Sequence, residues 1–479
     1  MTGAAPLGGR GELLAATVVA LAVGVGLLAR ADAGAGAQGA VAEPNVIVVL
    51  TDDQRTKDML AMPLSKRRIG GRGVTFTRAW ATFPLCCPSR ATNLTGQYAH
   101  NHGVRDNVAP EGGITPFNDT ATTATALDGA GYRTAFVGKY LNGYLALARE
   151  DPPYVPPGWD RWLAAGFPGR MWGWTQVVNG VLRTWGTQRE KRHYQTDVLA
   201  RQANSFVRSS LEQETPFFLT VATLAPHGEH RPRASVASPR PAPRHRHDFE
   251  RQPLPKPESF NEADVSDKPA WVQDNPRIDA ELRRALRARN RDRLASLSAV
   301  DELVAGLIDE LREGRALQDT LVIFTSDNGF LMGQHRLRGK NVAYRESASV
   351  PLLARGAGLP KGAKVSAPVG NIDVAATIYD ATGVPPAIEP DGISLLDVAA
   401  DPEAHADRDL LIETTRSGGV RTPGFLYVEH ESGDVELYDT GVDPFELDSV
   451  HGDPAYASIR AELAQRLDEL RDCEGGECG

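Results

Sequence analysis

Four stretches of the chain are continuous runs of mostly apolar residues, without the alternation expected of a half-exposed strand. They cover residues 45–50, 132–137, 216–222 and 320–325. Short runs rich in β-branched and aromatic residues are typical of parallel strands that are buried on both faces. We therefore predict that these four stretches belong to one large central sheet that is mostly parallel.

Helical periodicity occurs between these runs. Residues 123–130 have a helical pattern that stops at Gly131, and apolar residues recur at helical spacing from Leu294 to Leu311, with Gly314 beyond them. Buried strands that alternate with helices predict the α/β class, in which helices flank a central sheet.

The pattern changes near residue 406. Shorter strands are expected at 410–413, 425–429 and 435–438, and residues 459–470 have the pattern of an amphipathic helix. We predict a large α/β domain over 44–405 and a small C-terminal subdomain over 406–479. The subdomain should be an antiparallel sheet with one helix.

The first residues are typical of an export signal. Arg10 precedes an apolar run from Leu13 to Leu28, and small residues follow it. We predict a signal peptide over 1–33 and a flexible mature terminus over 34–43. The alternative is an uncleaved membrane anchor, for which the apolar run is short. The mature protein is then expected to be secreted, or held at the cell surface, with no stable membrane span.

The formal net charge is −9. Because nucleic-acid binding usually requires a basic surface, this balance argues against a nucleic-acid partner, and any polyanion site must be local. One local candidate is the insertion over 228–257, which is rich in arginine, proline and histidine. It is either a solvated insertion or the rim of a cleft that recognises sulfate-like oxyanions.

The chain has 4 cysteines, at 86, 87, 473 and 478. Cys473 and Cys478 are close enough to close a small ring, and in an exported protein a disulfide is the expected outcome. A zinc pair is the alternative, but no second Cys or His pair stands nearby.

Polar residues follow two of the predicted strands directly. Asp52 and Asp53 come after the first strand, and Asp327 and Asn328 come after the strand at 320–325. Ligands of open α/β sheets bind at the carboxyl ends of the strands, and oxygen donors of this kind suit Ca²⁺ or Mg²⁺ rather than Zn²⁺. The alternative is a pair of solvated turns.

Cys86 begins a short stretch whose residues favour the start of a helix. Pro88 biases Cys87 away from helix, and residues 89–92 can start one. Cys86 would then lie at a helix N-terminus, which favours an anion, and Arg90 could point back toward it. The alternative is that Cys86 and Cys87 are two small buried apolar residues.

The run from Cys86 through Pro88-Ser89-Arg90 to Leu94-Thr95-Gly96 resembles the sulfatase signature, C-x-P-S-R followed by L-T-G, at every fixed position. The strand that ends in two aspartates and the A-P-H motif at 225–227 extend the resemblance, which covers about 45–447. It implies the alkaline-phosphatase-like fold of sulfatases.

The resemblance also implies a cofactor set. Cys86 would be converted to formylglycine by a formylglycine-generating enzyme during biosynthesis, and its aldehyde hydrate would be the nucleophile. A Ca²⁺ ion, with Mg²⁺ as the alternative, would be held by the modified Cys86 and four oxygen donors, which are Asp52, Asp53, Asp327 and Asn328.

Further roles follow from matched positions. Arg90, Lys139 and Lys340 would bring positive charge to the sulfate, and His227 would be the acid/base near the leaving group. Leu141 stands where the family commonly has His, so residues 138–142 are more similar to the N-acetylglucosamine-6-sulfatase branch. Asn142 and His335 are additional candidates for substrate binding.

Arg345 interrupts a pair of acidic residues that the family commonly has after the tyrosine at 344. We expect this departure to affect packing more than chemistry.

The expected function is therefore hydrolysis of a sulfate monoester to an alcohol and inorganic sulfate. The expected substrate is a sulfated carbohydrate, such as an N-acetylglucosamine-6-sulfate unit of a glycosaminoglycan. Two alternatives remain at this point. One is a phosphonate or phosphate ester hydrolase of the same superfamily, and the other is a non-catalytic binder of sulfated glycans in which Cys86 stays unmodified.

Overall fold

The computed structural model describes residues 43–149, 152–166, 169–186, 191–229, 236–356 and 358–479. The residues from Glu43 to Gly479 form one compact unit. The predicted signal peptide over 1–33, and nearly all of the flexible terminus over 34–43, lie outside the described residues.

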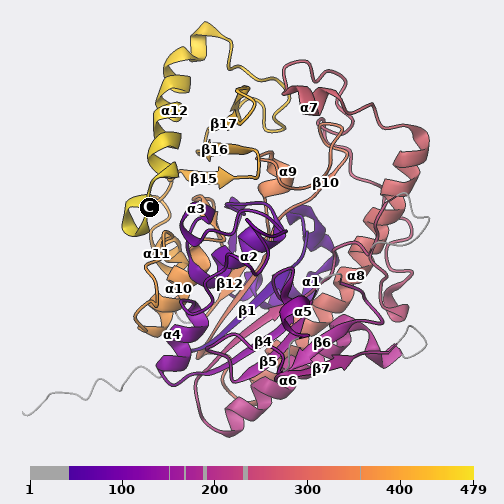
Figure 1. Ribbon diagram of the computed structural model, residues 1–479, viewed down its shortest axis with the longest axis vertical. Helices are drawn as coiled ribbons and strands as arrows, with labels where there is room; N and C mark the ends of the chain where they lie inside the picture. The colour runs from indigo at the N-terminus through magenta and orange to yellow at the C-terminus, as the bar shows by residue number, and fades with distance from the viewer. Residues whose placement is uncertain (1–42, 150–151, 167–168, 187–190, 230–235, 357) are drawn as a thin grey trace, which may run out of the picture. The chain divides into compact units, whose positions relative to one another are not determined.

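A ten-stranded sheet forms the centre of this unit (Figure 1). Its middle strands are parallel, and antiparallel pairs occur toward both edges. The four apolar runs of the sequence became neighbouring central strands, β9, β1, β8 and β4. The strands, in spatial order, are β13 (Ala363–Val365), β2 (Val74–Phe76), β12 (Leu352–Arg355), β9 (Thr320–Ser326), β1 (Asn45–Thr51), β8 (Phe217–Ala222), β4 (Arg133–Lys139), β5 (Arg161–Ala165), β6 (Thr175–Val178) and β7 (Val181–Thr184).

Helices cover both faces of the sheet. Apolar side chains of α6 (Gln195–Glu212) and α8 (Ala280–Glu313) pack in one core cluster with β1, β8 and β9. Those of α4 (Thr123–Gly129), α10 (Asp373–Thr382) and α11 (Leu395–Ala400) pack in a second cluster on the opposite face. The sheet is thus buried on both sides, which is why its central strands are apolar throughout.

The long helix α8 begins well before its predicted apolar pattern. The side chain of Asp279 accepts a hydrogen bond from the backbone N–H of Leu282 and so caps the first turn. Four of the eight residues in the first two turns are exposed to solvent, and the apolar stripe becomes regular only near Leu294. Periodicity therefore detected the part of this helix with a regular apolar stripe. It missed the N-terminal part, where three of the four buried residues are polar or charged: Leu286, Arg289, Asn290 and Arg293.

The C-terminal region is a four-stranded antiparallel sheet with one helix, as expected. The strands are β15 (Leu410–Glu413), β16 (Ser417–Arg421), β17 (Phe425–His430) and β18 (Val435–Asp439), paired in that order. Helix α12 (Ala457–Arg471) packs on this sheet through Leu463, Leu467 and Leu470. Cys473 and Cys478 form a disulfide just beyond it. The α/β fold class with a small antiparallel C-terminal sheet is confirmed.

The arginine-rich insertion is held against α6 and α8 where it is described. Arg244 pairs with Asp197 of α6 and with Glu302 of α8, and Arg240 pairs with Glu229. These two arginines have carboxylate partners within the protein. Residues 230–235 of the insertion, with Arg231 and Arg233, lie outside the described residues.

Short elements complete the unit. No helix within the described ranges has the length and apolarity needed to cross a bilayer. The short helices are α1 (Pro63–Arg68), α2 (Cys86–Thr95), α3 (Ala99–His102), α5 (Tyr144–Leu147), α7 (Ala270–Gln273) and α9 (Arg345–Ala348), and the strand pairs are β3 (Ala79–Trp80) with β14 (Val369–Gly370) and β10 (Leu331–Met332) with β11 (Arg338–Gly339).

Candidate active site

Four oxygen-bearing side chains meet at the carboxyl ends of β1 and β9. Asp52 and Asp53 follow β1, Asp327 and Asn328 follow β9, and each of the four residues is at most 1 % exposed. The backbone N–H of Asp53 donates to Asp327 Oδ1 at 3.0 Å, and Asn328 Nδ2 donates to Asp53 Oδ1 at 2.8 Å. The two turns predicted from the sequence therefore form one buried cluster rather than two solvated loops.

Asp53 adopts a left-handed backbone conformation, with φ of 69°. This region is uncommon for a residue with a side chain, and such conformations persist where the surroundings enforce them. Here Arg293 of α8 donates to the carbonyl oxygen of Asp53 and, at 3.4 Å, to that of Pro226. Arg293 therefore fixes the loop after β1 and the loop after β8 relative to each other.

The two adjacent cysteines face different surroundings. Cys86 is the first residue of α2, and its Sγ lies 2.8 Å from Lys340 Nζ and 3.5 Å from Lys139 Nζ. It also lies 3.7 Å from Asp52 Oδ1. Cys87 instead packs among apolar residues, and its Sγ accepts a hydrogen bond from the backbone N–H of Asn142. Only Cys86 faces the polar cluster.

Three cations, of which Arg90 and Lys139 are buried and Lys340 is partly buried, are interleaved with the three carboxylates. Lys139, the last residue of β4, contacts Asp52, and Lys340 contacts Asp53. Arg90 of α2 donates to Asp327 Oδ2 from Nε at 3.0 Å and approaches the same oxygen from a terminal nitrogen at 2.8 Å. The charges therefore offset one another inside a region from which water is largely excluded.

This arrangement shifts the pKa values of the cluster. Burial alone would raise the pKa of Asp53, but Lys340 and His227 hold it at about 2, and Lys139 likewise holds the pKa of Asp52 well below its usual range. Burial and the charge of Asp52 raise the pKa of Asp327 to about 6. Burial, with Asp52, raises the pKa of the Cys86 thiol to about 12. An unmodified Cys86 is therefore a thiol at neutral pH and a weak nucleophile.

The cluster is least buried at His227 and Lys340. The side chain of His227 is 21 % exposed and that of Lys340 is 13 % exposed, against 3 % for Lys139. His227 follows β8, and its Nε2 lies 3.8 Å from Asp53 Oδ2. Burial lowers the pKa of His227, which favours the neutral imidazole. A ligand that reaches the carboxylates must therefore pass these two side chains.

A cavity of about 220 Å³ lies beside Lys340. No motif in the sequence indicated it, because its polar lining comes mainly from loops and strands of the C-terminal sheet. The side chains that line it are mixed aromatic, hydroxyl, amide and charged, and they include Trp271, Asn341, Thr415, Arg416 and His430.

Two predicted substrate-binding residues lie apart from the cluster. His335 is fully buried, its Nδ1 lies 2.6 Å from Glu262 Oε2, and its ring stacks on Tyr344. A substrate contact by His335 stays a prediction, and this geometry does not favour it. Asn142 lies beside Cys87 rather than Cys86, so its contact with substrate also stays a prediction.

The packing expectation for Arg345 agrees with its contacts. Its backbone N–H donates to Glu446 Oε2 at 2.8 Å, and its guanidinium donates to the carbonyl oxygen of Pro444. Arg345 therefore joins α9 to the loop after β18.

Comparison with known proteins identifies the family. The Sulfatase family profile matches residues 44–384, and the profile described as N-sulphoglucosamine sulphohydrolase, C-terminal, matches residues 333–473. The chain therefore belongs to the sulfatase family. Within the family it lies in the branch that contains the N-acetylglucosamine-6-sulfatases.

Individual relatives agree with this placement. The human N-acetylglucosamine-6-sulfatase is 34 % identical over 371 residues, which cover 74 % of this chain and 64 % of the relative. The extracellular sulfatase SULF-1 homolog of Drosophila melanogaster is 34 % identical over 362 residues, covering 74 % of this chain and 31 % of the relative. The chain spans 31 to 64 % of the length of the first curated relatives that it matches.

A solved structure shares the fold. It is a complex of a protein with its substrate D-glucosamine-2-N,6-O-disulfate, with a TM-score of 0.71 and 24 % sequence identity. The match covers 90 % of this chain and 97 % of that chain.

The donor set fits the divalent cation that the family implies. One ligand atom from each of Asp52, Asp53, Cys86 and His227 lies within 4.8 Å of the others. Asp327 Oδ1 accepts a hydrogen bond from the backbone N–H of Asp53, and Asn328 Nδ2 donates to Asp53 Oδ1, so both side chains border this group. Carboxylate and amide oxygens are the donors that Ca²⁺ and Mg²⁺ prefer.

We predict that Asp327→Asn lowers the affinity for Ca²⁺ at least tenfold, because loss of even an outer partner of a metal ligand typically costs 10–100-fold. The amide keeps the size of the side chain and can still accept from Arg90, so the fold should be retained. Metal content after dialysis against graded Ca²⁺, together with urea unfolding, measures both effects.

Asp301→Asn is the matched control, because Asp301 is a buried carboxylate that accepts hydrogen bonds from Leu64 and Ser65 away from this cluster. Equal metal content in both variants and the unsubstituted protein would remove Asp327 from the metal site.

Proposed function

We propose that this chain hydrolyses a sulfate monoester of a carbohydrate, with formylglycine made from Cys86 as the source of the nucleophile. The observation that carries the proposal is the placement of Cys86. It lies at the N-terminus of α2 between two lysines and an aspartate, whereas Cys87 is held in the apolar core.

The proposed divalent cation is held by Asp52, Asp53, Asp327 and Asn328, together with the modified Cys86. Ca²⁺ is our first choice, and Mg²⁺ is the alternative. When bound, such a cation supplies positive charge that polarises a sulfuryl oxygen, and the formylglycine hydrate supplies the attacking oxygen.

Lys139 and Lys340 stabilise negative charge on the sulfuryl oxygens. Both ammonium groups contact the Cys86 sulfur, so they lie where a sulfuryl group on this residue would be placed. Preorganised cations in a water-excluded site stabilise a transition state more than they would in water. Burial opposes their charge, but the aspartates raise the pKa of each lysine, so both stay protonated.

Arg90 positions these groups. Its guanidinium binds Asp327 and donates to the carbonyl oxygen of Lys139 at 2.8 Å. It therefore joins α2, which carries Cys86, to the ends of β9 and β4. This contact fixes the nucleophile relative to the metal ligands and to the lysine.

His227 protonates the departing alcohol. Although burial lowers its pKa, the neighbouring Asp52 and Asp53 oppose this effect and stabilise the imidazolium that carries the proton. It lies on the least buried side of the cluster, where the organic part of a substrate would remain after the sulfate enters. A histidine within reach of the leaving oxygen is the usual general acid for such a step. Lys340, which shares this side, is the second candidate proton donor.

The substrate class follows from the adjoining cavity and the relatives. Trp271 offers a flat apolar face, and the neighbouring hydroxyl, amide and charged groups can bond several sugar hydroxyls. The relatives named N-acetylglucosamine-6-sulfatase make a 6-sulfated amino sugar, alone or in a glycosaminoglycan, our proposed substrate. Because two relatives are named extracellular sulfatases, we propose that this chain also acts outside the cell.

Cys86, and not Cys87, should carry formylglycine when the protein is produced with the converting enzyme. Mass spectrometry of the tryptic peptide covering 79–90 should show one aldehyde, at position 86, and one alkylatable thiol. Cys87→Ala is the control and should retain the aldehyde. Two thiols in a preparation that turns over an aryl sulfate would contradict the proposal.

Lys340→Ala should lower kcat by roughly 10²–10³, because it removes a preorganised donor aimed at developing charge. Lys340→Arg should restore only part of the loss, since a planar guanidinium does not replace a compact ammonium in a fitted site. The measurement is aryl sulfate turnover at equal formylglycine content.

The exposed Lys364 of β13 supplies the control variant, Lys364→Ala, which should keep its kcat. A near-normal kcat for Lys340→Ala would remove Lys340 from the mechanism.

A further inference from the structure

A second, larger cavity lies near the amino-terminal end of the central strand β9, on the side of the sheet opposite to the strand ends that carry the active site. Its volume is about 650 Å³, and Leu317 and Gln318 in its wall precede β9, whereas the active site follows the end of that strand. Strand β9 has 7 residues, so the two sites are separated by about 20 Å along the sheet.

The lining of this cavity is strongly basic. It contains six arginines and one lysine, and none of the described residues that line it is acidic. The seven cationic residues come from separate parts of the chain, which explains why no sequence motif revealed the cavity. The cationic residues are Arg67, Arg68, Arg72, Arg312, Arg315, Arg355 and Lys361.

Few of these charges are offset within the protein. Arg68 and Arg312 both pair with Asp309, and Arg355 donates to the carbonyl oxygen of Arg68. Among the described residues, no ion pair involves Arg72 or Lys361. This concentration of positive charge occurs in a chain whose net charge is −9, so it is not a consequence of overall composition.

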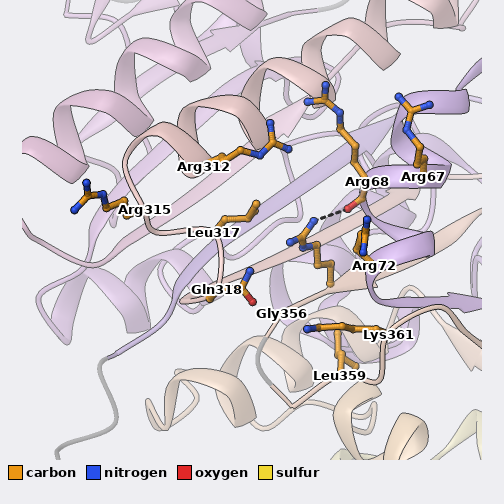
Figure 2. Close-up of a pocket in the computed structure, with 11 residues that line it drawn as sticks. Arg67, Arg68, Arg72, Arg312, Arg315, Leu317, Gln318, Gly356, Leu359 and Lys361 are labelled. Atoms are coloured by element: carbon orange, nitrogen blue, oxygen red, sulfur yellow. Dashed lines mark hydrogen bonds between the residues drawn. The ribbon is translucent and has the colours of Figure 1, made fainter.

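The like charges repel one another. Partial burial lowers the pKa of Arg355, and the neighbouring Arg312 and Arg72 lower it further. Figure 2 shows Arg312 across the cavity from Arg67 and Arg72, with Lys361 near Arg72. An anion between these side chains would relieve the repulsion, and guanidinium groups match the oxygen geometry of sulfate and phosphate.

We propose that this cavity is a non-catalytic binding site for a compact ligand that carries several sulfate or phosphate groups. Its volume lies within the range of small-molecule sites, about 300–1,000 Å³, and the cations on opposing walls can each bind a separate group. The site is independent of the proposed hydrolysis, because its lining shares no residue with the active-site cluster.

Isothermal titration at 0.15 M salt tests the proposal with two probes, sucrose octasulfate and inositol hexakisphosphate. The test variant is Arg72→Glu/Lys361→Glu. The matched control is Arg284→Glu/Arg287→Glu, which changes the net charge equally at two exposed arginines of α8. We expect the test variant to weaken binding at least tenfold and the control variant to weaken it less than threefold.

Binding at the active site is separated by repeating the titration on Lys340→Ala, which should retain the cavity site. Aryl sulfate turnover and the unfolding midpoint, if both are unchanged, show that the test variant is folded. If the double variant is not folded, the single variant Lys361→Glu is used in its place. Binding of one probe, with loss in the test variant, supports the site and identifies sulfate or phosphate as the preferred group. Binding of neither probe, or equal weakening in the test and control variants, would overturn the proposal.

Discussion

The structure depends on the burial of three carboxylates at one edge of a parallel sheet. Asp52, Asp53 and Asp327 are essentially inaccessible to solvent. Burying an unpaired carboxylate is costly, so each must be matched by a cation and by hydrogen-bond donors. Arg90, Lys139 and Lys340 fulfil this requirement, and they come from three different parts of the chain. The need to offset these charges therefore determines which loops and helices must meet at this edge.

The same requirement explains the position of α2. The helix begins at Cys86, and Arg90, one turn further along, binds Asp327 and the carbonyl oxygen of Lys139. Consecutive residues of a helix point in directions about 100° apart, so Cys86 and Cys87 cannot face the same surroundings. Once Arg90 is bound, Cys86 faces the cluster and Cys87 faces the core. The ion pairs thus select which cysteine lies in the candidate active site.

The central strands and the polar residues at their ends were predictable from sequence. Apolar runs are a direct consequence of burial on both sheet faces, and parallel strands bring their carboxyl ends to the same side of the sheet, so Asp52 and Asp327 were expected on that side. That the two residues are close together follows from the direct pairing of β1 with β9, which the structure shows. Lys340 is different, because it lies in an irregular loop and only the resemblance to sulfatases indicated its placement.

Other residues could not be placed by these arguments. Arg293 gave a weak signal, as a charged residue on the side of α8 that packs against the core. Its partners are the carboxylate of Asp58 and the backbone carbonyls of two distant loops, which no local pattern links to it. The cavity beside Lys340 and the basic cavity each combine side chains from several separate segments. Such sites arise from tertiary packing and leave no local pattern. His335 illustrates the converse case, because a motif position suggested contact with substrate while packing buries the ring against Tyr344.

The most direct test of the central claim is the ratio of kcat/KM for matched p-nitrophenyl esters, the sulfate and the phenylphosphonate, measured on protein of known formylglycine content. A sulfate presents three terminal oxygens to the cations of the cluster, whereas a phosphonate replaces one of these oxygens by an organic group that cannot accept a hydrogen bond from an ammonium or guanidinium group. We predict that the sulfate is preferred at least tenfold, a difference of about 1.4 kcal/mol in transition-state stabilisation. A preference for the phosphonate would contradict the assignment of this cluster to sulfate ester hydrolysis.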